Sequence, residues 1–174
     1  MRKVLCVLLV LLSLWSCAFA EGGVFVPDYN TFMDSFSEKL KATDKGLHKE
    51  FVEDHKENGE WVSFDSNVYI IGKKPYIHVQ QGAGFLNTYR MAQERKDFAD
   101  SDELFKQLML ESSLTICPDL NVETFFDDIC YDYVVDSPAS YITTYYNCGV
   151  YLFNFTKTSR EMEFEIRLSV YEAQ

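Results

Sequence analysis

A strict alternation of apolar and polar residues near the C-terminus constrains the fold most. Apolar residues occupy every second position, and polar or charged residues fill the gaps: Met162, Phe164, Ile166, Leu168 and Val170 alternate with Glu163, Glu165, Arg167 and Ser169. A period of two places the apolar side chains on one side of a β-strand. The pattern therefore predicts a strand with a buried inner face and a polar outer face.

Two aromatic segments precede this strand and are predicted to join the same sheet. Residues 125–135 and 141–155 are rich in Tyr, Phe and Val, which are common in strands. A turn at residues 157–160 would then place Phe153 opposite Phe164. We expect three long antiparallel strands that share one aromatic inner face.

The first third of the chain has helical periodicity instead. Asp28 can cap a helix, and a second helix is expected to begin near Thr43 or Asp44 and to end at residues 58–59. The apolar residues of the first helix fall on one stripe: Phe32, Met33, Phe36 and Leu40. These helices can cover the inner face of the sheet, which makes the chain an α+β protein.

The middle of the chain mixes the two periods. Residues 67–71 and 76–79 are predicted as strands joined by a turn. A helix is expected to follow the glycine-containing segment 82–84, because apolar residues suited to packing come after it. Residues 104–116 fit a strand and a helix equally well.

The N-terminus has the three parts of a secretory signal. A basic start at Arg2 and Lys3 leads into an apolar run over residues 4–14, and residues 18–20 form a small-x-small cleavage pattern. We therefore expect residues 1–20 to be removed and residues 21–174 to form a single secreted, extracellular domain.

In a secreted protein, cysteines can form disulfides and an asparagine in an Asn-x-Ser/Thr sequence can carry a glycan. Three cysteines follow the signal, which predicts one disulfide and one leftover thiol, or an intermolecular bridge. A hairpin centred on Ala139 would place Cys130 opposite Cys148, so this pair is the favoured cross-strand disulfide, with Cys117 left free. Asn154 begins the only Asn-x-Ser/Thr sequence and is the predicted glycosylation site.

The charge of the chain excludes some partners. The formal net charge is −11, and nucleic acids and anionic membranes both select surplus Lys and Arg, so neither is an expected partner. His48 and His55 have no Cys, His or Asp neighbours at the spacing of a metal site. We predict no metal and no cofactor.

Residues 63–89 carry a resemblance to a known family. They read SFDSNVYIIGKKPYIHVQQGAGFLNTY, in which a strand with an acidic residue leads through a Gly/Pro turn to a short strand and then to glycines before a predicted helix. This order resembles the nuclear-transport-factor-2-like superfamily, which includes ketosteroid isomerase and polyketide cyclases. The resemblance implies a cone-like α+β barrel, with N-terminal helices packed on a curved antiparallel sheet around a cavity. Residues 97–119 depart from the family's order.

The predicted function is binding of a small apolar or aromatic molecule in that cavity. Its lining would come from tyrosines and one asparagine that the predicted strands place on the inner face: Tyr131, Tyr133, Tyr145, Asn147 and Tyr151. A tyrosine-rich sheet face also suits a protein core or an interface, so a homodimer formed through the sheet is a second expectation.

Two further functions stay open at this point. An acid/base enzyme of the isomerase or cyclase type would use Asp127 or Asp65 as its base inside the cavity, where burial raises the pKa of a carboxyl group. A lipocalin-like extracellular carrier would also bind a small ligand, but the helical first third does not fit its all-β barrel. We expect binding rather than catalysis.

Overall fold

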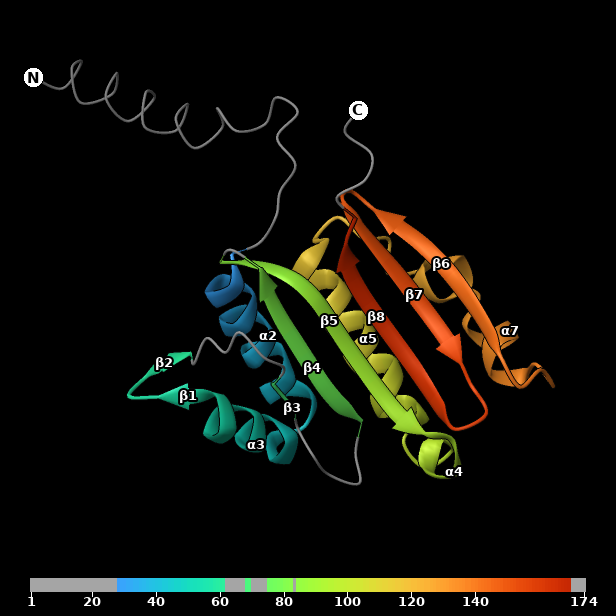
Figure 1. The fold of residues 1–174 in the computed structure, drawn as a ribbon, viewed down its shortest axis with the longest axis horizontal. Coiled ribbons are helices and arrows are strands. Elements are labelled where there is room, and N and C mark those ends of the chain that lie inside the picture. Colours follow the sequence, from blue (N-terminus) through green and yellow to red (C-terminus); the bar gives the residue numbers. More distant parts are fainter. Residues whose placement is uncertain (1–27, 62–67, 70–74, 83, 170–174) are drawn as a thin grey trace, which may run out of the picture.

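The computed structural model describes residues 28–61, 68–69, 75–82 and 84–169 (Figure 1). In this part of the chain, helices lie on one side of an antiparallel sheet, so the α+β prediction is confirmed. The predicted signal, residues 1–20, and the candidate base Asp65 fall outside the described residues.

Three helices pack against the sheet or against one another as the sequence pattern requires. They are α2 (Tyr29–Thr43), α3 (Lys45–His55) and α5 (Asp102–Ile116). The Asp28 side chain caps α2 by accepting a hydrogen bond from the backbone N–H of Thr31, and Asp44 caps α3 in the same way. The two N-terminal helices are confirmed, and the ambiguous segment 104–116 is helical.

The main sheet has the strand order β3-β4-β5-β8-β7-β6 and is antiparallel throughout. Its strands are β3 (Val68–Tyr69), β4 (Tyr76–Gly82), β5 (Phe85–Glu94), β6 (Ile142–Cys148), β7 (Tyr151–Lys157) and β8 (Glu161–Leu168). A separate small hairpin consists of β1 (Lys56–Glu57) and β2 (Glu60–Trp61). Among the described strands, β3 and β6 are free edges, so the sheet is not closed into the predicted barrel.

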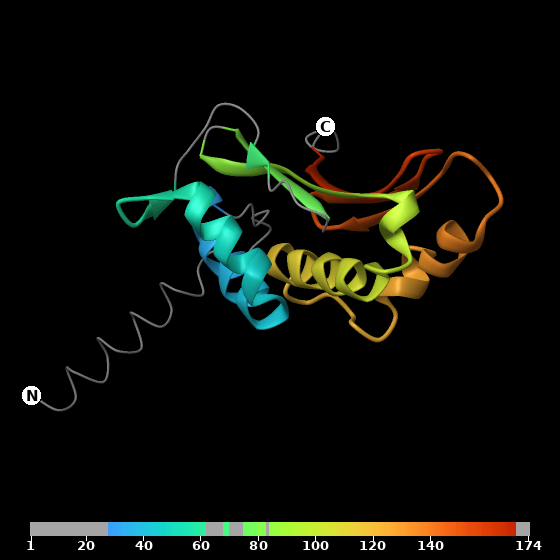
Figure 2. The same ribbon diagram turned by 90° about the horizontal axis from the view of Figure 1, so that it is seen from below.

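Figure 2 shows α2 and α5 on one side of the sheet, and the core that these helices share with the sheet fills its inner face. The ring of Tyr89 on β5 contacts Phe32 and Phe36 of α2 edge-on, with ring centroids 6.0 and 5.3 Å apart. On β7 and β8, Phe153 and Phe164 are completely buried. Burial of this aromatic surface holds the helices on the sheet.

The segment after residue 84 is a strand, and the prediction of a helix there was wrong. Gly84 has φ +86°, which allows a tight turn, and the chain re-enters the sheet as β5. Tyr89 and Met91 alternate with Thr88 and Arg90. β5 lies between β4 and β8, where every second side chain must be apolar.

Residues 125–135 form two short helices, and the prediction of a strand there was wrong. These helices are α6 (Phe125–Asp128) and α7 (Tyr131–Asp136), with Cys130 between them in the left-handed region at φ 56°. The buried residues Phe125 and Ile129 are four apart, which matches a helical repeat, while Asp127 faces water. Aromatic composition suggested a strand, but burial follows helical spacing.

The segment 141–155 is not one strand but a tight hairpin. Gly149, at φ 59°, lies in the turn between β6 and β7, and Cys148 pairs with Tyr151. The hairpin centred on Ala139 is therefore wrong. The β7–β8 pairing differs from the prediction by two residues, because Phe164 pairs with Phe155, and this shift keeps the predicted inner face.

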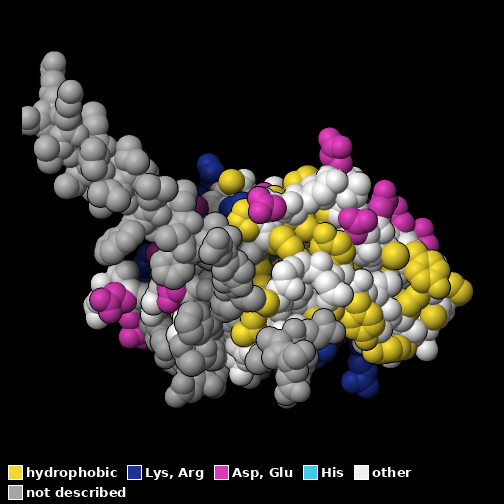
Figure 3. Space-filling view, turned by 90° about the horizontal axis from the view of Figure 1, so that it is seen from above, with side chains coloured by type: hydrophobic (Ala, Val, Ile, Leu, Met, Phe, Trp, Pro, Cys, Tyr) yellow, Lys and Arg dark blue, Asp and Glu magenta, His cyan; other side chains and the backbone are white. Residues whose placement is uncertain are grey.

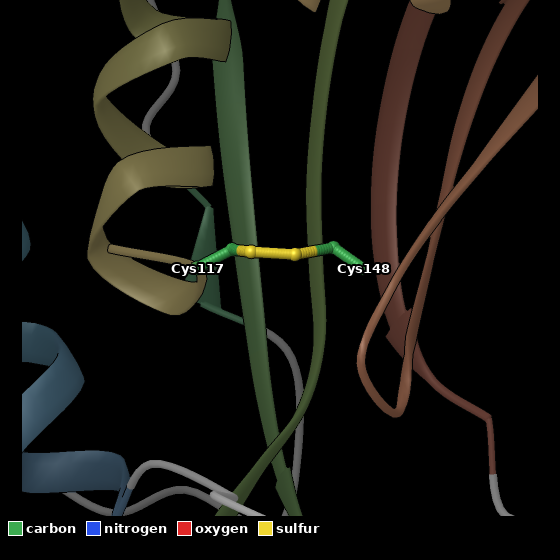
Figure 4. Close-up of a disulfide and its surroundings, with 2 residues drawn as sticks. All are labelled: Cys117 and Cys148. Atoms are coloured by element: carbon green, nitrogen blue, oxygen red, sulfur yellow. A yellow bond between two sulfur atoms is a disulfide. The ribbon is translucent and has the colours of Figure 1, made fainter. Parts of the chain in front are cut away.

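The disulfide joins Cys117 to Cys148, and the predicted Cys130–Cys148 pair was wrong (Figure 4). Cys148 ends β6 on the inner face and meets the residue that follows α5, with a Cα–Cα distance of 6.5 Å. This separation lies in the usual disulfide range of about 4.4–6.8 Å. Cys130 is the free and exposed cysteine, because it lies between α6 and α7 instead of on a paired strand.

Lys157 ties α7 to the sheet. Its side chain is buried at the end of β7, and its Nζ donates hydrogen bonds to the backbone carbonyls of Val135 and Ser137, at 2.7 and 2.5 Å. A cation is favourable at the C-terminal end of a helix, where carbonyl groups lack helical partners. Lys157 therefore replaces the apolar residue that the strand pattern would place here.

Hydrophobic side chains gather at the end of the molecule seen in Figure 3. Apolar residues that are exposed or only partly buried include Val122, Val150 and Leu168. No helix in the described part of the chain is both long and apolar enough to cross a membrane.

Candidate functional site

The residues predicted to line one cavity are separated by the structure. Tyr131 and Tyr151 belong to the core. The Tyr131 ring stacks on Phe155 with a centroid distance of 4.8 Å, and its hydroxyl donates to Asp102. The Tyr151 hydroxyl donates to the backbone carbonyl of Leu86 at 3.1 Å. Both rings fill space between the sheet and the helices, so neither lines a void with the other predicted residues.

Burial raises the pKa of the Tyr131 hydroxyl, and its hydrogen bond to Asp102 raises this pKa further. The phenol is therefore protonated at neutral pH and acts as a hydrogen-bond donor. It stabilises the contact between α7 and α5, and it is no proton acceptor.

The other three predicted lining residues are exposed. Tyr133 on α7 is 66% exposed, and Tyr145 on β6 is 58% exposed. Tyr145 and Asn147 lie on the outer face of the sheet, opposite the core. The cause is the turn at Gly149, because it moves the odd-numbered residues of β6 to the face opposite those of β7. An uninterrupted strand would have kept Tyr145 and Tyr151 on one face.

The structure gives Asp127 no place in a buried acid/base site. Asp127 is exposed on α6 and points away from the core that Phe125 enters. The other candidate, Asp65, lies outside the described residues. The described part of the chain also holds no group of three or more His, Cys, Asp or Glu side chains placed to bind a metal ion.

A hollow lies on the outer face of the sheet, which no described helix covers and which faces the viewer in Figure 1. We call this side the open face. The hollow has a volume of about 330 Å³ and spans β6, β7 and β8. Its lining is mostly polar and aromatic: Tyr141, Thr143, Tyr145, Asn154, Thr156, Thr158, Glu163, Glu165 and Arg167.

Two rows of paired residues form the floor of the hollow. In the first row, Tyr145 on β6 lies opposite Asn154 on β7, which lies opposite Glu165 on β8. In the second row, Thr143 lies opposite Thr156, which in turn lies opposite Glu163. Hydrogen bonds link neighbours within each row. The two threonine hydroxyl oxygens are 2.8 Å apart, and the Asn154 Nδ2 donates to the Glu165 Oε2 at 2.9 Å.

The two carboxylates of these rows differ in their charge partners. Glu163 forms a salt bridge with Arg90 of β5, at 2.5 Å between Oε2 and Nη2. This hydrogen bond raises the pKa of the Arg90 guanidinium above its usual range. Glu165 has no Lys, Arg or His nitrogen within salt-bridge distance among the described residues, although Arg90 is its register partner on β5. Arg90 instead reaches toward Glu161 and Glu163.

Two further features define the polar character of the hollow. Asn154 is only 8% exposed, and its Oδ1 is buried without a hydrogen-bond partner among the described residues. His78, further along the open face, has a pKa that burial and then Arg90 lower and that Glu165 partly raises; the net shift is downward, so His78 adds no positive charge at neutral pH. The hollow therefore offers acceptors and aromatic rings beside a single lining cation, Arg167.

Part of this site is visible in the sequence as the polar residues of the alternating segment 162–170. The alternation along β8 correctly predicts that Glu163, Glu165 and Arg167 lie on the outer face, but it does not by itself predict a hollow there. Tyr145 was predicted on the inner face with Tyr151, because the prediction did not include the turn at Gly149. The geometry allows the hollow to bind and orient a small molecule.

Comparisons with known proteins add no relative. No family model, no curated protein and no solved structure matches this chain.

Proposed function

We propose that this protein is an extracellular binding domain that holds a small molecule in the hollow on the open face of its sheet. The observation that carries the proposal is the hollow itself, with two exposed tyrosines facing a row of polar groups. Its volume of about 330 Å³ is in the range of small-ligand sites, about 300–1,000 Å³. The proposed site therefore lies on the outer face of the sheet, and not in the aromatic cavity between the sheet and the helices that the sequence predicted.

An extracellular location is supported by two features. Residues 1–20 have the pattern of a secretory signal. The Cys117–Cys148 disulfide fits an oxidising compartment, where such bonds persist. We therefore keep secretion as part of the proposal.

The predicted glycan at Asn154 competes with a ligand. Asn154 lines the hollow and uses its Nδ2, the atom to which a glycan attaches, to donate to Glu165. A sugar there would occupy the hollow. Binding experiments should therefore use protein whose intact mass excludes a glycan, such as protein made in the bacterial periplasm, where the disulfide also forms.

Filling the hollow should abolish binding. Thr156→Phe adds a ring on the floor of the hollow, whereas Gln80→Phe adds the same ring to the open face three strands away, on β4. Saturation-transfer NMR with a panel of small aromatic amines, alcohols and carboxylates measures binding. We expect at least one chemical class to bind wild type and Gln80→Phe but not Thr156→Phe. If no compound distinguishes the two variants, the proposal is wrong.

Membership of the predicted superfamily, a homodimer and acid/base catalysis are supported by fewer features of the structure. Kinship with the nuclear-transport-factor-2-like superfamily is supported by N-terminal helices followed by long C-terminal strands, while strand β5 stands where that resemblance implies a helix. A homodimer through the sheet would use the free edge strand β6. Acid/base catalysis has no support from the exposed Asp127.

A further inference from the structure

We infer that the ligand of the hollow is an organic cation: a primary ammonium group attached to an aromatic or apolar body. This inference rests on the proposed function and names its ligand class. It depends on an unpaired carboxylate, an unsatisfied acceptor and two aromatic walls that meet in one place.

The unpaired carboxylate is Glu165. Its neighbour Glu163 is neutralised by Arg90, whereas Glu165 forms no salt bridge among the described residues: it accepts a hydrogen bond from the Asn154 Nδ2, and His78 is a more distant electrostatic neighbour. Glu165 is partly buried on the strand β8. An approaching cation stabilises a partly buried carboxylate more than a fully exposed one, because water screens the attraction between the two charges less.

The unsatisfied acceptor is Asn154 Oδ1. A buried acceptor without a partner costs roughly 1–3 kcal/mol, and a ligand N–H group can satisfy it. The hydrogen bond from Nδ2 to Glu165 fixes the amide beside that carboxylate. Tyr145 lies directly opposite Asn154 and is mostly exposed, so its ring can turn aside and admit the ligand. One ammonium group can then donate to both residues.

The aromatic walls are Tyr141 and Tyr145. They are 65% and 58% exposed, so both rings are accessible to a ligand in the hollow. The face of a tyrosine ring attracts a cation, and it also stacks against an aromatic ligand body. The walls therefore suit both parts of an arylalkylammonium ion.

Charge disfavours the alternative ligand classes. An anion would meet the carboxylate of Glu165, and the exposed Arg167 is strongly screened by water. The net charge of −11 also attracts cations to the protein. A metal ion lacks a suitable set of carboxylates in the described part of the chain. An organic cation is the class that uses all the features of the hollow.

The test uses three probes of the same shape: phenethylammonium, phenethyl alcohol and phenylacetate. Calorimetric titration of the unglycosylated protein at low salt should show the ammonium binding roughly tenfold more tightly than the alcohol, with the carboxylate weakest. Glu165→Gln keeps the side-chain shape and should remove this tenfold preference. Glu161→Gln changes a carboxylate on the same strand and face but outside the hollow, and should keep it.

Each outcome decides between the two proposals. Added salt should weaken ammonium binding to wild type more than to Glu165→Gln, because only wild type uses the carboxylate charge. If the alcohol or the carboxylate binds as tightly as the ammonium, and Thr156→Phe still abolishes that binding, the cation inference is wrong but the proposed function stands. If none of the probes binds, the cation inference fails, and the larger panel then decides the proposed function alone.

Discussion

Replacing Cys148 with serine should lower the free energy of unfolding by about 3 to 4 kcal/mol. The disulfide from Cys117 to Cys148 closes a loop with a sequence separation of 31 residues, and it restricts the unfolded chain accordingly. It also fastens the end of α5 to the edge strand β6. Urea denaturation of the variant and the wild type, followed by circular dichroism, measures the difference.

The remaining cysteine provides the matched control. Cys130 is free and exposed, so Cys130→Ser should change the free energy of unfolding by no more than about 0.5 kcal/mol. The double replacement of Cys117 and Cys148 should cost about as much as Cys148→Ser alone, since both remove one bond. A large loss in Cys130→Ser together with no loss in Cys117→Ser would restore the cross-strand pairing and contradict the fold at α6 and α7.

Replacing Phe125 with alanine should cost about 3–5 kcal/mol of unfolding free energy. Phe125 is completely buried, and its ring contacts Tyr146, Phe153 and Phe164 edge-on, with centroids 6.2 to 6.5 Å apart. A helix as short as α6 has little stability of its own, so this one side chain holds it on the sheet. Urea denaturation again provides the measurement.

Two variants control this prediction. Phe125→Leu keeps much of the buried surface and should cost clearly less than Phe125→Ala. Asp127→Asn changes an exposed residue of the same helix and should be neutral within about 0.5 kcal/mol. It should also leave ligand binding unchanged, since Asp127 is not part of the hollow. A loss below about 1 kcal/mol in Phe125→Ala would show that α6 does not pack on the inner face.

The parts of the fold that the sequence predicted are those in which local pattern and burial agree. Asp28 caps α2, whose stripe of Phe32 and Phe36 faces the core. Met162 to Leu168 alternates along β8, with the even-numbered residues inside. In each of these elements one period describes both the secondary structure and the burial.

The parts that were mispredicted depend on tertiary context. Residues 125–135 are rich in aromatic side chains and therefore resemble a strand, but only the position of the sheet decides that Phe125 and Ile129 enter the core from helices. Residues 85–94 have apolar positions that also suit a helix, and they form a strand because the segment pairs with β4 on one side and β8 on the other.

A single turn explains why the candidate site was misplaced. The segment 141–155 has the pattern of a single strand, but a turn at Gly149 divides it into β6 and β7. The odd-numbered residues therefore lie on the outer face in β6 and on the inner face in β7. Tyr151 is therefore a core residue, whereas Tyr145 lines the hollow. The distances between Asn154, Glu165 and Tyr145 follow from pairing three strands, which no local pattern specifies.

The location of bound phenethylammonium on the protein tests the proposed binding site most directly. Intermolecular nuclear Overhauser effects between this probe and protein side chains distinguish the two faces of the sheet. We predict contacts to the ring protons of Tyr141 and Tyr145 and to the methyl group of Thr156, all on the open face. Contacts to Tyr151 and Phe153 instead would place the ligand between sheet and helices and would contradict the account.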